Sequence, residues 1–290
     1  MIKVVSVLLF LFLAPLIGAL IEGLDRKITA RMQGRVGPPL LQPFYDVVKL
    51  WHKETRSVNP LQRFFIIAYW VILLATGALF FYGGDLLLVI FLLTLAGTFS
   101  VLQAYAANSP YSHIGAQREL SAMLAFEPIL LLVAVGFYLS NGNFEVASLI
   151  QASQPAIVVM PGLFVTMGWV MLIETHKSPF DISSGHHMHS ELVSGLRTEL
   201  TGRMLMLDNL ASWYKTVLLL SITALFFIHA AAWSWLLALA VLVLFYFVMI
   251  LVDNTSPRVR WETQLKSFWI VALALGAVNV LILMAIGGRV

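Results

Sequence analysis

The chain contains no cysteine. This absence excludes structural disulfide bonds, and it excludes iron–sulfur clusters held by cysteine thiolates of this chain. If electrons move close to this protein, a different subunit must therefore carry them.

Charged residues are also scarce. Only 11% of the 290 residues are charged, whereas 60% are hydrophobic, and the mean hydropathy is +0.88. A soluble domain could not bury so much apolar surface, so the composition predicts an all-α polytopic membrane protein with a single membrane domain over residues 1–290. Apolar runs predict eight transmembrane helices at about 2–24, 63–82, 86–106, 117–140, 156–175, 207–229, 232–252 and 265–287. We expect amphipathic helices in the loops at about 25–62, 176–206 and 253–264.

The few basic residues are distributed unevenly over these loops. Fifteen of the eighteen Lys and Arg residues fall in or beside the loops that follow the odd-numbered spans. On the opposite side there are only Lys3 and Arg289, and Lys215 lies inside a span. Because cytoplasmic loops are enriched in Lys and Arg, this asymmetry predicts that both termini lie outside and that the large odd-numbered loops are cytoplasmic.

The segment from Asp25 to Glu54 interrupts the apolar chain and holds six of its Lys and Arg residues. Lys27, Arg31 and Arg35 recur every four residues, which predicts a helix with one cationic stripe that ends at the Gly-Pro-Pro of residues 37–39. A second amphipathic pattern follows, with apolar residues at 44, 48 and 51. Such a loop could lie on anionic lipid headgroups or dock a peripheral protein, and the pattern leaves both possibilities open.

Several ionisable residues fall inside or at the ends of the predicted spans, where charge is costly and indicates a functional pathway. Glu127 lies near the middle of the fourth span and precedes Pro128, which should kink the helix and leave room for water. If the spans enclose a shared cavity, the ionisable groups could conduct protons; the alternative for Glu127 is a neutral carboxyl hydrogen-bonded to a neighbouring helix. The candidate proton-path residues are Glu22, Glu119, Glu127, Glu174, Glu191, Glu199, Asp208 and Lys215.

The loop after the fifth span is rich in histidine. His186, His187 and His189 match no established metal-ligand spacing, so we expect a polar, hydrogen-bonding loop and no metal site. Ser190 is a suitable N-cap for a short helix that would carry Glu191 and Glu199 on adjoining sides.

The chain carries the following motifs in order: Asp25-Arg26, Gln33-Gly34-Arg35-Val36-Gly37-Pro38, Leu41-Gln42, Gly115-Ala116-Gln117-Arg118, Glu174-Thr175, Pro179-Phe180-Asp181 and Glu191-Leu192-Val193 with Glu199-Leu200-Thr201-Gly202. This series resembles the membrane subunit shared by respiratory complex I and the membrane-bound NiFe hydrogenases. The sequence differs from the quinone-reducing subunits of this family in two places. A Gly-Pro-Phe-Gly element is missing from the first loop, and the run at residues 183–189 stands where those subunits have an acidic Pro-Glu-Ala-Glu sequence. In both features the chain is similar to the Ech-type energy-converting hydrogenases. Glu127-Pro128 likewise resembles the hydrogenase pattern.

The resemblance implies a non-catalytic subunit in a prokaryotic cell membrane that anchors a ferredoxin-dependent NiFe hydrogenase and couples its reaction to H⁺ or Na⁺ translocation. Its partners would be the hydrogenase small and large subunits, an antiporter-like membrane subunit, a ferredoxin-type subunit and membrane lipid, without nucleic acid. This chain would hold no cofactor, whereas partner subunits would carry 4Fe-4S clusters and the NiFe centre. The expected partner-docking residues are Arg26, Lys27, Arg31, Arg35, Asp46, Lys49, Arg118, Asp181, His186, His187 and His189. The alternatives are a quinone-site subunit of a complex I-type oxidoreductase and a stand-alone membrane transporter.

Overall fold

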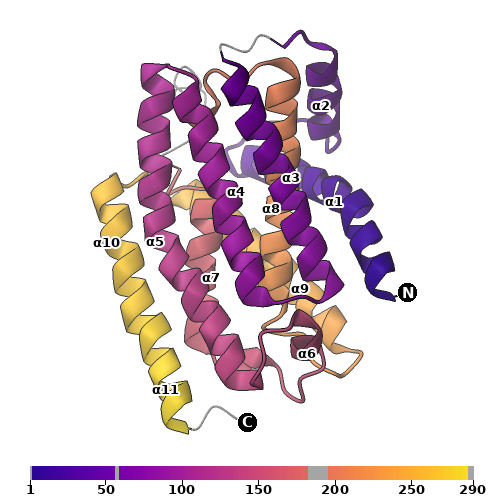
Figure 1. Cartoon of the computed structure of the whole chain (residues 1–290), viewed down its shortest axis with the longest axis vertical. Helices are drawn as coiled ribbons and strands as arrows, with labels where there is room; N and C mark the ends of the chain where they lie inside the picture. Colours follow the sequence, from indigo (N-terminus) through magenta and orange to yellow (C-terminus); the bar gives the residue numbers. More distant parts are fainter. Residues whose placement is uncertain (1, 56–58, 182–194, 287–290) are drawn as a thin grey trace.

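The computed structural model describes residues 2–55, 59–181 and 195–286. In these ranges the fold is helical, and an isolated bridge between Asp85 and Glu145 is the one β-type pairing. The main helices are α1 (Ile2–Met32), α2 (Gln42–His52), α3 (Pro60–Tyr82), α4 (Leu86–Ala106), α5 (Pro110–Asn141), α6 (Val146–Ile150), α7 (Pro161–Glu174), α8 (Gly202–Ala224), α9 (Ser234–Thr255), α10 (Trp261–Val271) and α11 (Val278–Ile286), as drawn in Figure 1. The short helical segments η1 (Ala156–Val158), η3 (Gly195–Arg197) and η4 (Ala272–Ala277) join some of them, and η4 is a π-helical segment between α10 and α11.

The predicted polytopic all-α class is confirmed, but the number of eight spans is not. Within the described ranges, six helical segments are long and apolar enough to cross a membrane: Lys3–Met32, Pro60–Tyr82, Leu86–Ala106, Pro110–Asn141, Ser234–Thr255 and Trp261–Ile286. The predicted fifth and sixth spans correspond to α7 and α8. With 14 residues α7 is short for a bilayer of about 30 Å, and the 23 residues of α8 include Arg203, Asp208 and Lys215.

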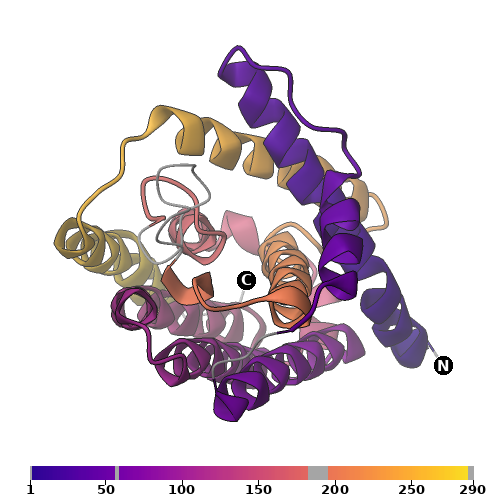
Figure 2. The ribbon, with the colours of Figure 1, turned by 90° about the horizontal axis from the view of Figure 1, so that it is seen from above.

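The position of α7 and α8 explains why α7 is shorter and α8 more charged than a lipid-facing span. Figure 2 shows these two helices inside a ring formed by α1, α3, α4, α5, α9 and the α10–α11 segment. Contacts of α8 with α1 and α3, and of α7 with α5, agree with this view. An inner helix is shielded from lipid by its neighbours, so it can be short or carry charge at membrane depth.

The first loop differs from its prediction at one helix end. Instead of reaching the Gly-Pro-Pro sequence, α1 continues from the first span and ends at Met32, and Gly34, whose φ is +69°, turns the chain away from the helix. The Gly34 N–H donates to the Arg31 carbonyl and the Arg35 N–H donates to the Ala30 carbonyl, which together form a Schellman motif. Arg35 therefore lies beyond the helix, and the predicted cationic stripe is reduced to Lys27 and Arg31.

The rest of the first loop folds back on α1. A Cβ added to Gly23 would lie 2.1 Å from the Leu40 carbonyl oxygen, and one added to Gly37 would lie 3.0 Å from the Lys27 Cα. The two glycines thus allow the backbone of residues 37–40 to lie directly against the helix. The amphipathic helix α2 then packs on α8 and α1 through Pro43 and Leu50, while Tyr45, Val48 and Trp51 remain more than half exposed.

Candidate functional site

A cavity of about 810 Å³ lies between α1, α3, α4, α5, α7, α8 and α9. Its walls combine apolar side chains with an unusual number of charged ones for a membrane domain. The charged residues that line it are Glu22, Asp25, Arg26, Arg35, Glu119, Glu174, Lys177, Asp181, Arg197, Asp208, Lys215 and Asp253. The shared cavity on which the predicted proton path depends is therefore present.

The inner helices contribute one ion pair to this cavity. Lys215 of α8 places its Nζ 2.8 Å from Oε2 of Glu174, the last residue of α7. The two side chains are 14% and 7% exposed. Because each charge is largely removed from solvent, each depends on the other for compensation.

A second ion pair lies two helical turns earlier on α8. Arg197 Nε is 2.6 Å from Oδ2 of Asp208, and the Asp208 side chain is buried. Asp208 and Lys215 are seven residues apart on α8, about two turns, and both line the cavity from the same face of the helix. They are not paired with each other, however, because each has its own partner on a different segment. The buried Tyr69 of α3 lines the same part of the cavity.

At the end of α1 the charges form a chain that reaches α2. Arg26 binds Glu22 on its own helix and donates from Nη1 to Asp46 Oδ2 at 2.9 Å. The indole N–H of Trp213 on α8 also donates to Glu22. Lys49 lies 3.8 Å from Asp46, and its side chain is 62% exposed, so this last contact adds little stability.

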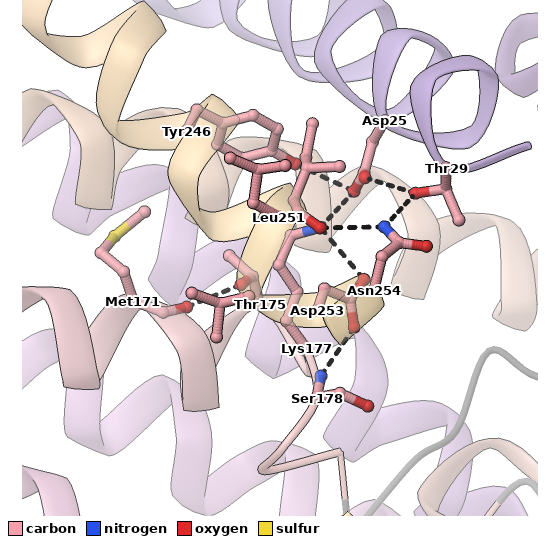
Figure 3. Close-up of polar contacts among 12 residues, drawn as sticks. Asp25, Thr29, Met171, Thr175, Lys177, Ser178, Tyr246, Leu251, Asp253 and Asn254 are labelled. Atoms are coloured by element: carbon pink, nitrogen blue, oxygen red, sulfur yellow. Dashed lines mark hydrogen bonds and ion pairs between the residues drawn. The ribbon is translucent and has the colours of Figure 1, made fainter. Parts of the chain in front are cut away.

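A further cluster joins α1, the turn after α7 and α9, as Figure 3 shows. Lys177 lies between Asp25 and Asp253, and the Tyr246 hydroxyl donates to Asp25 Oδ2 at 3.3 Å. Close by, Asp181 forms an ion pair with Arg258, whose Nη2 lies 2.7 Å from Asp181 Oδ2. In the sequence, Lys177 and Arg258 are distinguished only as loop charges that predict the orientation, and no pattern indicates a role for Tyr246 or Asp253.

The remaining predicted proton-path residues lie in different places. Glu119 of α5 lines the cavity. Glu127 is half-buried on α5 and does not line it, but it interacts electrostatically with Glu174. Glu199 is half-buried just before α8 and is also absent from the cavity wall. Glu191, together with His186, His187 and His189, lies outside the described residues.

The predicted docking residues fall into two groups. Arg31, Arg35, Lys49 and Arg118 are exposed, and Lys27 is half-buried on α1. The other described members, Arg26, Asp46 and Asp181, are engaged in the ion pairs given above. The exposed group is the one that could meet a partner without first breaking a buried contact. Among the described residues no cluster of three or more His, Asp or Glu side chains is arranged to hold a metal ion.

Comparison with known proteins identifies the family of the chain. A family model described as NADH dehydrogenase matches residues 3–284. NADH-ubiquinone oxidoreductase chain 1 of Balaenoptera physalus is 31% identical over 249 residues, which cover 79% of this chain and 76% of that relative. The same subunit of Perameles gunnii is 28% identical over 297 aligned positions, with 92% and 91% coverage.

A solved structure has the same fold. One chain of the membrane-bound sulfane sulfur reductase, described as an archaeal respiratory membrane complex, aligns with a TM-score of 0.79 at 24% identity and covers 97% of this chain and 99% of that chain. The family predicted from the motifs is confirmed by these matches. The chain belongs to the NADH dehydrogenase family and is a multi-pass membrane subunit of its complex I-like branch.

Proposed function

We propose that the chain is the membrane anchor and ion-path coupling subunit of a ferredoxin-dependent NiFe hydrogenase that couples redox energy to H⁺ or Na⁺ translocation. The observation that carries the coupling role is the cavity with its ion pairs, above all Lys215–Glu174 on the two inner helices. Compensated charges around a cavity can hold water and exchange protons at membrane depth. The hydrogenase branch is supported by the shortened first loop and by Glu127-Pro128.

In this proposal the chain carries no redox centre. The partner small and large subunits hold the 4Fe-4S clusters and the NiFe centre, and an antiporter-like subunit continues the ion path. The exposed end of α1 and the turn after α7 face the peripheral subunits in the cytoplasm, and both termini lie on the outer side of the membrane. The chain's own residues position carboxylates and exclude bulk lipid from the path.

A quinone-site subunit is the second candidate. The relatives named NADH-ubiquinone oxidoreductase chain 1 favour it, since their sequence similarity extends over most of the chain. The cavity also reaches the first-loop residues Val36, Gly37 and Pro38. A stand-alone transporter, in contrast, would move ions as an isolated chain.

Purification of the intact complex through a tag on this chain would test whether it belongs to a hydrogenase or to a quinone reductase. We expect a NiFe large subunit to copurify, identified by mass spectrometry, and the complex to evolve H₂ from reduced ferredoxin. The same preparation should be assayed with a soluble quinone and with a sulfane sulfur compound as the acceptor. Reduction of either acceptor without H₂ evolution would contradict the hydrogenase assignment, and ion transport by the isolated chain would support a transporter.

Charge reversal at Arg31 and Arg35 tests whether the end of α1 docks a partner. Both side chains are exposed, so the double variant Arg31→Glu/Arg35→Glu should change the fold stability by no more than about 1 kcal/mol. We expect the peripheral subunits to be lost from the membrane, because the cationic end of α1 would no longer attract acidic groups of the partner. Blue native electrophoresis followed by mass spectrometry measures this loss.

A matched control uses two other exposed cations, Arg260 and Lys266. Arg260→Glu/Lys266→Glu changes the net charge equally and should leave the complex intact. If the variant at residues 31 and 35 also keeps all its subunits, the end of α1 contacts lipid and docks no protein.

A further inference from the structure

The polar cluster of Figure 3 joins three segments that are far apart in the sequence. Lys177, in the turn after α7, lies with its Nζ 2.5 Å from Asp25 Oδ2 of α1 and 3.7 Å from Asp253 Oδ2 of α9. Its side chain is only 5% exposed, and the ammonium also lies 5.3 Å from the centre of the Tyr246 ring. A single buried cation thus connects two helices of the outer ring.

The cluster contains one ammonium group and two carboxylates, and the ammonium is closer to the carboxylate of α1. A buried ammonium that had one carboxylate partner and lost it would remain uncompensated, which is strongly unfavourable. With two carboxylates within reach, Lys177 can tighten on either Asp25 or Asp253 and remain paired. Asp25 belongs to α1 and Asp253 to α9, so either helix can hold the turn through this ammonium.

The surrounding hydrogen bonds fix the positions of the two carboxylates. The Tyr246 hydroxyl donates to Asp25, and the Ser178 N–H donates to Asp253 Oδ1 at 2.8 Å. Between the helices, Asn254 Nδ2 donates to Thr29 Oγ1 at 3.1 Å. These contacts hold α1 and α9 together around the ammonium.

Glu174, the last residue of α7, lies only three residues before Lys177. The Lys177 N–H donates to the Leu172 carbonyl at 2.9 Å, and Thr175 Oγ1 donates to the Met171 carbonyl at 2.6 Å. The segment from the last turn of α7 to Lys177 is therefore one hydrogen-bonded unit. Glu174 extends from this unit to Lys215 of α8, while Lys177 extends to α1 and α9. Both ion pairs therefore start from one hydrogen-bonded segment.

We propose that Lys177 is a positioning residue that holds Glu174 against Lys215 and transmits the position of the end of α1 to the ion path. The inference rests on the proposed function, because it concerns the step between the redox reaction and ion movement. Lys177 acts through Glu174 and carries no ion itself.

The test compares Lys177→Met with Lys177→Arg in the intact complex, reconstituted in vesicles. We expect Lys177→Met to lower the number of ions translocated per electron pair by at least about fivefold, the low end of usual coupling free energies, while electron transfer continues. Lys177→Arg should restore most of the ratio, since it keeps the cation. The control is Lys266→Met, which removes an exposed ammonium of α10 and breaks no ion pair of the cluster. An unchanged ratio in Lys177→Met, or an equal loss in Lys266→Met, would overturn the inference.

A second measurement does not depend on which acceptor the complex uses. Hydrogen–deuterium exchange of the intact complex should show faster exchange at the ends of α1 and α9 in Lys177→Met than in wild type or Lys266→Met. Unchanged exchange there would also overturn the positioning role. If the wild-type complex shows no H₂-linked ion movement, the proposed hydrogenase function fails, and the exchange comparison still decides the role of Lys177.

Discussion

Replacement of Lys215 by Met should abolish ion translocation and destabilise the complex. The substitution leaves the Glu174 carboxylate 7% exposed and without the ammonium that lies 2.8 Å away in the structure. Removing one partner of a buried ion pair costs up to about 3 kcal/mol here, at the low end of the usual range because both groups line a cavity. Ion movement in vesicles and the thermal unfolding of the purified complex measure the two effects.

The double variant Glu174→Gln/Lys215→Met separates stability from function. It removes both charges, so no buried charge remains unpaired, and the thermal stability should return close to that of wild type. Ion translocation should stay absent, since neither group can exchange a proton or compensate one. Recovery of translocation in the double variant would show that the pair is structural only.

The sequence was sufficient to predict the helical membrane class because long apolar runs have few other solutions. It was less reliable at the helix ends. The first span was predicted to stop before Asp25, yet α1 continues to Met32, because polar residues can extend a helix beyond the membrane once its outer turns pack on other segments. The inner helix α7 is likewise shorter than its predicted span, since the chain before Pro161 forms η1 and a turn.

The candidate site could be predicted only in part, for a related reason. Glu174, Asp208 and Lys215 were found because charge at membrane depth is conspicuous in an apolar run. Their partners were not found, since Glu174 and Lys215 lie 41 positions apart in the sequence and meet only when α7 packs beside α8. Lys177 has an ordinary loop context in sequence, so only the fold shows that it is buried between two carboxylates. Local patterns identify the charged groups, whereas helix packing decides their partners.

Replacement of Glu127 by Gln is the second change for which we expect a large functional effect. Gln has nearly the same size as Glu but cannot release a proton, so the complex should assemble with a stability within about 1 kcal/mol of wild type. H₂-linked ion translocation should fall by about a hundredfold, the low end of the usual contribution of a proton-transferring side chain. The half-buried position of Glu127 beside Pro128 and its electrostatic interaction with Glu174 motivate this expectation.

A control at Glu262 makes the result specific. Glu262 is an exposed carboxylate near the start of α10, so Glu262→Gln removes the same charge and should leave translocation unchanged. The measurement is ion movement per H₂ in vesicles that contain equal amounts of assembled complex. Normal translocation in Glu127→Gln would mean that Glu127 is a neutral hydrogen-bonding group. The ion path would then run only through the cavity residues, from Glu119 to the Lys215–Glu174 pair.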